Sequence, residues 1–222
     1  MDSLKVDVRK LHLFNGLAKE GAGTVADHLQ QLSGIETAAE VSKLNFLDFD
    51  DVDAHLQAES KADKQVGIYV ELQAEPYGYL LFLFSLSEAK RLANAMLGDD
   101  PTAAGDDAGF TDMQKSAIQE VGNIMTSAFI DGWANVLSTT IEHSPPHFAF
   151  GDSDAILAEI TEWPDSEIVF VVDSHIAATD VELDLTCYTF PELEPLVDLI
   201  HGIEVEEITE AAQAPADFAD LT

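Results

Sequence analysis

The chain has 222 residues, 46% of them hydrophobic, so it can bury a real core in one large domain or two small ones. Its 42 Asp and Glu against 10 Lys and Arg give a formal charge of −32, and no Lys or Arg follows Lys115. Such a surface repels phosphate backbones and anionic lipids, which excludes nucleic acid and membrane surfaces as partners, while the apolar content is too high for a disordered acidic chain.

An acid-rich, lysine-poor surface around an ordinary core is typical of adaptation to a high-salt cytoplasm. In molar salt the Debye length falls to about 3 Å, so most of the self-repulsion would be screened. The acidity therefore indicates the habitat more than the partner. The N-terminus MDSLKVDVRK is not a secretory signal and no apolar run approaches 18 residues, so we expect a cytoplasmic protein.

The first half of the chain is expected to contain helices at both ends and two strands between them. Residues 3–33 are predicted to be helical, in one piece or in two pieces interrupted near Gly16 and residues 21–23. Strands are predicted at 66–72 and 77–84. Ser85 and Glu88 have the spacing of a capping box and begin a helix that ends at Gly98.

The second half begins after a linker that composition places at 99–109. Thr111 and Gln114 form a second capping box, which opens a long helix reaching about Leu137. The further elements expected in chain order are a short helix at 153–161, an apolar strand at 168–172, a strand at 181–185, and a helix capped by Thr189 and Glu192 that ends at Gly202. The acidic tail 203–222 is expected to be frayed or disordered.

The two halves resemble each other at an offset of 104 residues, which places Ser85 on Thr189 and Gly98 on Gly202. Each half is predicted as helix, strand, strand, helix, with an extra helix in the second. We therefore expect an α+β, two-layer fold in which duplicated units share one sheet around a pseudo-two-fold axis, since two or three strands are too few for independent stability. The single domain would span 1–202, with pseudo-repeats 1–98 and 110–202. The alternative is a coincidence between two ordinary α+β segments.

One row of the long helix carries polar residues of an unusual kind. Ser116, Glu120 and Asn123 are spaced by four and three residues, which puts them on one helical face beside a wide apolar face. Ser127 continues the row and Gly122 lies next to it, so small neighbours would leave room for another surface to approach. An ordinary solvated face is the alternative, although such a face in this chain should be filled with Asp and Glu.

The pattern Ser-x3-Glu-x2-Asn, followed by 22 residues and Pro146, resembles the active-site signature of the CheC/CheX/FliY family. The stretch FTDMQKSAIQEVGNIMTSAF is similar to the second-site helix of CheC, and the resemblance covers nearly the whole chain. The family removes phosphate from the chemotaxis response regulator CheY. The chain would thus be a haloarchaeal-looking member of this family.

The resemblance implies a role for each matching residue. Asn123 would orient the attacking water, because a carboxamide can do so without ionising. Glu120 would accept a bond from a lysine or similar donor of the regulator, and Ser116 and Pro146 would support the motif. No cofactor is expected in this chain, since the Mg2+ needed belongs to the regulator's own active site.

The family carries the same motif in each half, and here the first copy has diverged. The stretch GAG at 21–23 resembles the GAG that follows the first-site asparagine in the family. Counting from it, the first-site positions are His12, Gly16, Lys19 and Ser42, and none matches. We therefore expect this site to be inactive and kept as scaffold or binding surface.

Other candidate sites have simpler explanations. His143 and His147 are four residues apart, but the two prolines between them prevent the helix that would align them on a metal. Cys187, the only cysteine, and Trp133 are expected in the core, as are the aromatic residues of the strands.

The leading hypothesis is a phosphatase acting on the phosphorylated regulator. The alternative is a non-catalytic adaptor that binds the phosphorylated regulator, a CheD-like partner, or both. The Glu120 and Asn123 pair favours the enzyme, because an adaptor has no need to keep it. An acidic structural or storage protein has no support in the sequence.

Overall fold

The computed structural model describes residues 8–59, 64–100, 109–160, 168–178 and 183–202. The helices and strands follow in chain order as α1 Val8–Ser33, β1 Ala38–Asp48, α2 Val52–Glu59 (after the short 3-10 helix η1 Phe49–Asp51), β2 Gln65–Leu72, β3 Gly78–Ser85, α3 Leu86–Leu97, α4 Asp112–Leu137, β4 His147–Gly151, α5 Ser153–Ala158, β5 Ile168–Ala178, β6 Leu183–Pro191 and α6 Leu193–Gly202. Among these described residues no helix is long and apolar enough to cross a membrane.

The six strands form one antiparallel sheet in the order β1-β5-β6-β3-β2-β4. The order helix, strand, helix, strand, strand, helix occurs twice along the chain. The strands β1, β2 and β3 of the first half correspond to β4, β5 and β6 of the second. Replacing each strand by its counterpart gives the same order read from the opposite edge of the sheet, as a two-fold axis requires. The β3–β6 pairing joins the two halves at the centre of the sheet. The mixed α and β fold with a shared sheet is therefore as predicted, whereas the boundaries of the two pseudo-repeats stay a prediction.

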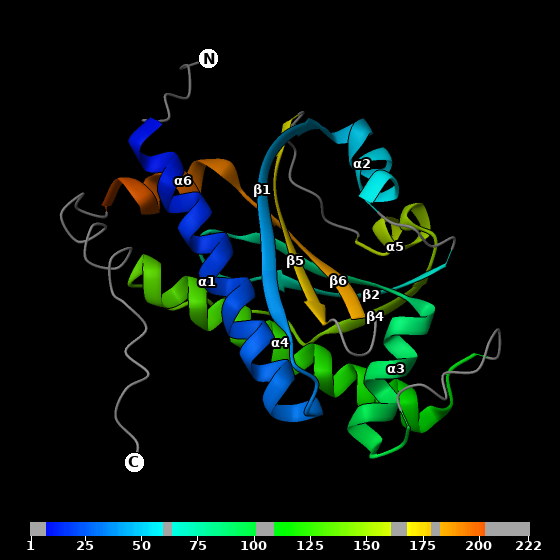
Figure 1. Ribbon diagram of the computed structural model, residues 1–222. Helices are drawn as coiled ribbons and strands as arrows, with labels where there is room; N and C mark the ends of the chain where they lie inside the picture. Colours follow the sequence, from blue (N-terminus) through cyan, green and yellow to red (C-terminus); the bar gives the residue numbers. More distant parts are fainter. Residues whose placement is uncertain (1–7, 60–63, 101–108, 161–167, 179–182, 203–222) are drawn as a thin grey trace, which may run out of the picture.

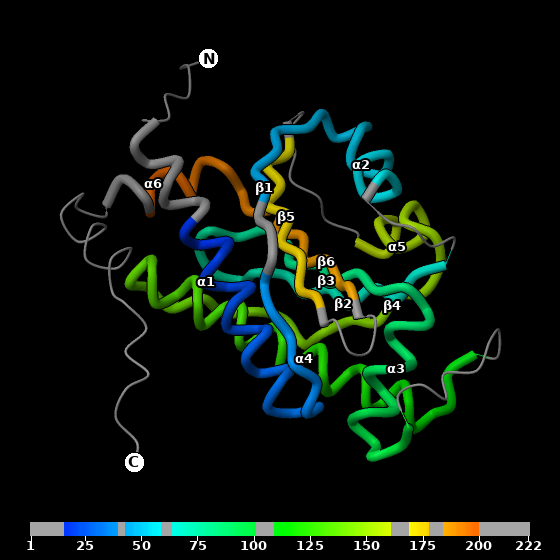
Figure 2. The backbone as a smooth tube through the Cα atoms, in the orientation of Figure 1, coloured from blue at the N-terminus to red at the C-terminus, as the bar shows by residue number. Residues whose placement is uncertain are grey.

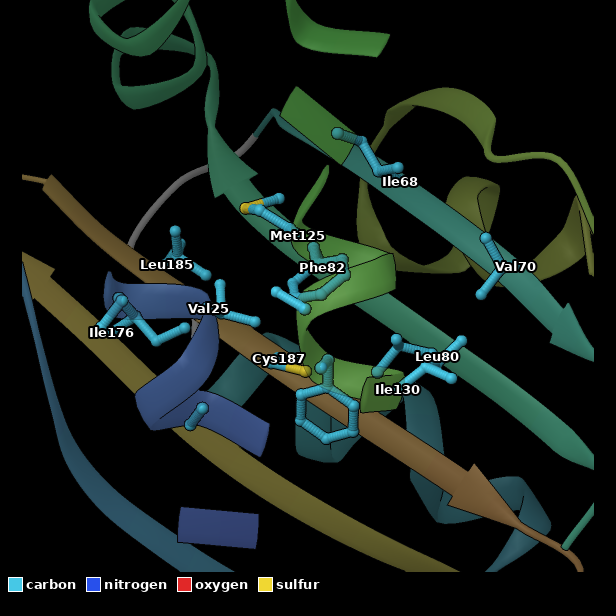
Figure 3. Packing of buried hydrophobic residues seen from close by; sticks show 14 of the residues in the cluster. Val25, Ile68, Val70, Leu80, Phe82, Met125, Ile130, Ile176, Leu185 and Cys187 are labelled. Atoms are coloured by element: carbon cyan, nitrogen blue, oxygen red, sulfur yellow. The ribbon is translucent and has the colours of Figure 1, made fainter. Parts of the chain in front are cut away.

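Helices cover both faces of the sheet to different extents. The long helices α1 and α4 cross on one face, α1 over β1 and β5 and α4 over β2 (Figure 1). The main core fills this interface, and Figure 3 shows Met125 of α4 and Val25 of α1 pointing at sheet residues such as Phe82 and Cys187. The short helices α2 and α5 lie together on the second face and cover a smaller cluster around Leu56 and Ile156. The trace in Figure 2 shows the same arrangement without the ribbons.

Both capping boxes expected before the long elements are present. The Ser85 hydroxyl accepts from the Glu88 amide at 3.2 Å, and the Glu88 carboxylate accepts from the Ser85 amide at 2.7 Å. Thr111 and Gln114 make the same reciprocal pair at the start of α4. Each box satisfies amides that have no partner inside the helix, so both helices begin where the sequence indicates.

The first helix differs from one of the two forms expected. Over its described residues α1 runs from Val8 to Ser33 without the break considered near Gly16 and residues 21–23. Gly21 is a buried residue within the helix. A glycine is needed there because a Cβ would lie 2.8 Å from the Phe129 ring of α4. This glycine serves the close crossing of two helices rather than an interruption.

Several other expectations are corrected by the sheet. Each half has a strand and a short helix between its long helix and its hairpin, so β1, β4 and α2 were missed. Thr189 does not cap a helix: it is buried in β6 opposite Leu80, and α6 begins only at Leu193, because pairing with β3 keeps the strand extended as far as Pro191. The strand expected at 181–185 thus extends to residue 191, and the helix expected at 153–161 ends at Ala158. Residues 3–7, most of the linker 99–109 and the tail 203–222 lie outside the described residues.

Candidate functional site

The polar row predicted on α4 lies on the solvent side of that helix. Ser116, Glu120 and Asn123 are all exposed. The opposite side of the same turns is fully buried against the sheet and α1, with Ile118 and Val121 at 0% exposure. The helix therefore presents the three side chains on one ridge, away from the core.

The side chains of this row are available to another molecule. Within the part of the chain that the structure describes, no hydrogen bond or ion pair is found for the side chains of Ser116, Glu120 or Asn123. The Asn123 carboxamide can donate through its NH2 group and accept through its oxygen, and it carries no charge at any ordinary pH. A carboxamide with both functions open can hold a water molecule in a set direction.

The helix that carries the row is held firmly in place. Gly122 is buried above β2, and a Cβ there would lie 2.5 Å from Cγ2 of Ile68. This corrects the expectation that Gly122 leaves room for a partner, since it leaves room for the sheet instead. At the start of α4, Gln114 Nε2 donates to Asn94 Oδ1 of α3 at 2.9 Å, which ties the first turn to the neighbouring helix. A fixed carrier suits side chains that must enter another protein's site in one geometry.

Pro146 is brought to the edge of the sheet beside the same strand. The residues on either side of the proline pair are anchored to β2: the Ser144 amide donates to the Glu71 carbonyl at 2.9 Å, and His147 is the register partner of Tyr69. Gly122 sits over Ile68 of this strand. The structure thus places the α4 turn that carries Asn123 and the segment that carries Pro146 next to one strand, although 22 residues separate them in sequence.

The diverged first site lies on α1 and β1. Gly16 and Lys19 are exposed on α1, while the side chains of His12 and Ser42 lie outside the described residues. These four positions precede Ser116, Glu120, Asn123 and Pro146 by 104 residues each, the offset that also relates α1 to α4. At the positions of Glu120 and Asn123, this copy holds a glycine and a lysine, so it has neither the carboxylate nor the carboxamide.

The two histidines of HSPPH are engaged separately. Nδ1 of His143 lies 2.8 Å from the Ser144 carbonyl, and the His147 ring stacks on Tyr69 with the ring centroids 5.1 Å apart. Among the described residues no group of three or more His, Cys, Asp or Glu side chains could hold a metal ion.

The remaining candidates are core residues, with one exception. Cys187 and Trp133 are buried as expected, and burial raises the pKa of the Cys187 thiol well above its ordinary value because a thiolate would be desolvated there. Phe82 and Phe84 pack in the sheet. Tyr77 does not, since it is 41% exposed in the turn before β3.

Neither of the two hollows found among the described residues is lined by Ser116, Glu120 or Asn123. A hollow of about 350 Å³ is found on the other face of the sheet, between η1, α2 and α5, where Phe49, Asp53 and Leu157 are among its lining residues. Glu120 and Asn123 instead project from a convex helix surface. Such a surface suits a macromolecular partner that supplies the rest of the site.

Comparison with known proteins identifies the family of the chain. The model of the CheC-like family matches residues 113–149, a stretch that contains Ser116, Glu120, Asn123 and Pro146. The Halobacterium salinarum protein named "Putative CheY-P phosphatase CheC1" is 42% identical over 201 residues, which cover 90% of this chain and 100% of that protein. The chain therefore belongs to the CheC family. The Bacillus subtilis protein "CheY-P phosphatase CheC" is 24% identical over 194 residues, covering 81% of this chain and 91% of that one.

Solved structures share the fold at low sequence identity. Thermotoga maritima FliY matches with a TM-score of 0.69 at 16% identity, over 90% of this chain and 97% of that chain. The FliM middle domain from H. pylori matches with 0.61 at 11%, over 89% and 100%. CheX from Desulfovibrio desulfuricans matches with 0.53 at 16%, over 79% and 99%.

Proposed function

We propose that this chain is a protein phosphatase that hydrolyses the phosphoaspartate of a CheY-type chemotaxis response regulator in the cytoplasm. The observation that carries the proposal is the pair Glu120 and Asn123, one turn apart and exposed on a fixed helix in a chain of the CheC family. The two relatives described above are named "Putative CheY-P phosphatase CheC1" and "CheY-P phosphatase CheC", which supports the proposal.

The chemistry required of such a visiting enzyme is small. A phosphoaspartate is a labile acyl phosphate, so the main task is to place a water in line with the phosphorus. The Asn123 oxygen accepts a bond from this water and orients its lone pair. The new P–O bond forms as the bond to the aspartate oxygen breaks, which yields inorganic phosphate and a free carboxylate. The Mg2+ of the regulator's own site stabilises the charge on the phosphoryl oxygens.

Glu120 fixes the position of the regulator in this proposal. Its carboxylate lies one helical turn before Asn123 and accepts a charge-assisted bond from a lysine or similar donor beside the phosphoaspartate. Ser116, one turn further back, leaves space for the partner, and Pro146 shapes the segment at the edge of the sheet. The alternative is an adaptor that binds the phosphorylated regulator, a CheD-like partner, or both.

The test is the decay of a cognate phosphorylated CheY-type regulator with Mg2+ in molar KCl, compared with its spontaneous decay. We expect wild type to accelerate the decay and Asn123→Ala to lose about 100-fold in maximal rate, because the water is no longer oriented. Glu120→Ala should mainly raise the regulator concentration needed for half-maximal rate, and the double variant should be inactive. Asn135→Ala is the matched control, since it removes an exposed carboxamide from the same helix outside the row.

Two outcomes would contradict the proposal. If wild type binds the phosphorylated regulator and leaves its decay unchanged, the chain is the adaptor considered above. If Asn123→Ala keeps full activity with an unchanged thermal midpoint, the chemistry lies elsewhere than on α4.

A further inference from the structure

The edge strand β4 carries two phenylalanines on the face of the sheet that α4 covers. Phe148 and Phe150 pair with Ile68 and Val66 of β2, which belong to the buried cluster beneath α4. Ala149 between them belongs to the cluster on the other face. Phe148 is half-buried against the α4 side, whereas Phe150 is 48% exposed. A large aromatic side chain is thus open to solvent at the sheet edge beside α4.

The start of α4 continues this apolar surface. Phe110 lies edge-on to Phe148 with the ring centroids 5.9 Å apart, and Met113 in the first turn is 68% exposed. Met113, Ser116 and Glu120 follow the spacing i, i+3, i+7 and share a helical face. We define the apolar strip as Phe110, Met113, Phe148 and Phe150: the Phe110–Phe148 contact joins β4 to the start of α4, and Met113 lies one turn before Ser116 of the polar row.

We propose that the apolar strip is a docking surface for the phosphorylated receiver domain, one that sets affinity while Asn123 sets the rate. This rests on the proposed function. A partner whose phosphoryl group reaches Asn123 must lie on α4, and a specific interface covers about 800 Å² on each side, far more than two side chains supply. The surface covered must extend to the exposed neighbours of Glu120 and Asn123, and Met113 of the strip shares the helical face of Glu120.

Because of the charge of the chain, apolar contacts should supply most of the binding free energy. At −32 the protein gains little from long-range attraction to most partners, and in molar salt charges more than about 3 Å apart are screened. Burial of apolar surface is not weakened in this way. Partly exposed aromatic and methionine side chains are also the types enriched at protein interfaces.

Single exposed hydrophobic residues are common on protein surfaces, so the strip needs a matched control. Phe49 provides one: it is 41% exposed, similar to Phe150, but lies in η1 on the opposite side of the sheet from α4. If the regulator binds exposed hydrophobic residues non-specifically, Phe49→Ser and Phe150→Ser should weaken binding equally. If the apolar strip is a specific docking surface, only Phe150→Ser should weaken binding.

The experiment measures binding of the cognate CheY-type regulator, activated with beryllofluoride and Mg2+, by titration calorimetry in molar KCl. We expect Met113→Gln/Phe150→Ser to raise Kd by about tenfold or more, as loss of an interface anchor does, with Phe49→Ser unchanged. The maximal dephosphorylation rate of the double variant at saturating regulator should stay within about twofold of wild type, since no group that acts on the phosphoryl is altered. The single variant Met113→Gln changes only an exposed residue of α4, so it controls for a folding defect in β4. It should weaken binding, but less than the double variant.

Binding and hydrolysis separate the two proposals. If the double variant binds as tightly as wild type, if Phe49→Ser weakens binding equally, or if wild type does not bind, the docking surface is wrong. If wild type binds, the double variant does not, and neither speeds the decay of the phosphorylated regulator, the docking surface stands and the phosphatase proposal fails.

Discussion

At the scale of single residues, Cys187 shows how burial in the sheet controls chemistry. It lies at the centre of the sheet in β6, opposite Phe82 of β3 and Ser174 of β5, and is fully buried (Figure 3). Burial disfavours the thiolate most; the Thr189 hydroxyl partly offsets this and the nearby carboxylate of Asp173 adds to it, so the pKa is raised well above its ordinary value. The folded protein therefore keeps this thiol protonated where the unfolded chain loses the proton.

The stability of the protein should consequently fall at alkaline pH. The unfolded thiol ionises through its ordinary pKa, which stabilises the unfolded state by about 1.4 kcal/mol for each pH unit above that value, up to the raised pKa of the folded state. We expect the unfolding free energy of wild type to drop more between about pH 7.5 and 9.5 than that of Cys187→Ala, measured by urea denaturation in molar KCl. The native thiol should also resist thiol reagents. Equal pH dependence in the two proteins would contradict the assignment.

At the scale of elements, the crossing of α1 and α4 depends on two glycines. A Cβ on Gly132 would lie 3.0 Å from the Cα of Gly21, and a Cβ on Gly21 would lie 2.8 Å from Phe129 and 3.0 Å from Trp133. Neither obstacle is a flexible side chain that can move aside cheaply. Helix α1, which carries the diverged first-site positions, thus packs closely against α4, which carries Glu120 and Asn123.

Two alanine substitutions in α1 should therefore have different effects on the unfolding free energy. Gly21→Ala should lower the unfolding free energy by about 1–3 kcal/mol, because the added methyl overpacks the crossing. Gly23→Ala is the matched control: nothing lies within 4 Å of a Cβ there, so better helix propensity should leave stability unchanged or raise it by up to about 1 kcal/mol. The measurement is the unfolding free energy of both variants and of wild type, from urea denaturation in molar KCl. A Gly21→Ala protein as stable as Gly23→Ala would mean that the helices are not tightly packed.

At the scale of the whole molecule, the net charge of −32 should make stability depend on salt. Like charges repel in the compact state, and raising salt from about 0.1 M to 1 M shortens the Debye length from about 10 Å to about 3 Å. We expect the thermal midpoint to rise with KCl over this range, by about 2–4 °C for each kcal/mol of repulsion removed.

A variant with less charge tests whether repulsion is the cause. Five exposed acidic residues outside the site can be replaced by their amides: Glu36, Asp99, Asp154, Glu192 and Asp198. This variant should show a higher midpoint in low salt and a smaller rise with KCl, because fewer charges need screening. A salt response equal to that of wild type would point to a cause other than self-repulsion.

Much of the candidate site is encoded locally. Helix α4 could be predicted from its capping box and apolar periodicity, and the common face of Ser116, Glu120 and Asn123 follows from helical spacing alone. The same holds for α3, whose first turn and αL glycine end are both determined by adjacent residues. These features need no distant partner, so the sequence by itself determines them.

The tertiary structure decided what depends on distant partners. The edge strand β4 is five residues long after two prolines, and only pairing with β2 makes it a strand, beside the helix turn that carries Asn123. The residues that follow Thr189 predict a helix cap there, but pairing with β3 holds Thr189 in strand β6. Sequence alone could not tell that Gly122 faces the sheet or that Phe150 faces solvent, because sheet pairing brings together residues far apart in the chain and short segments carry little local preference for it.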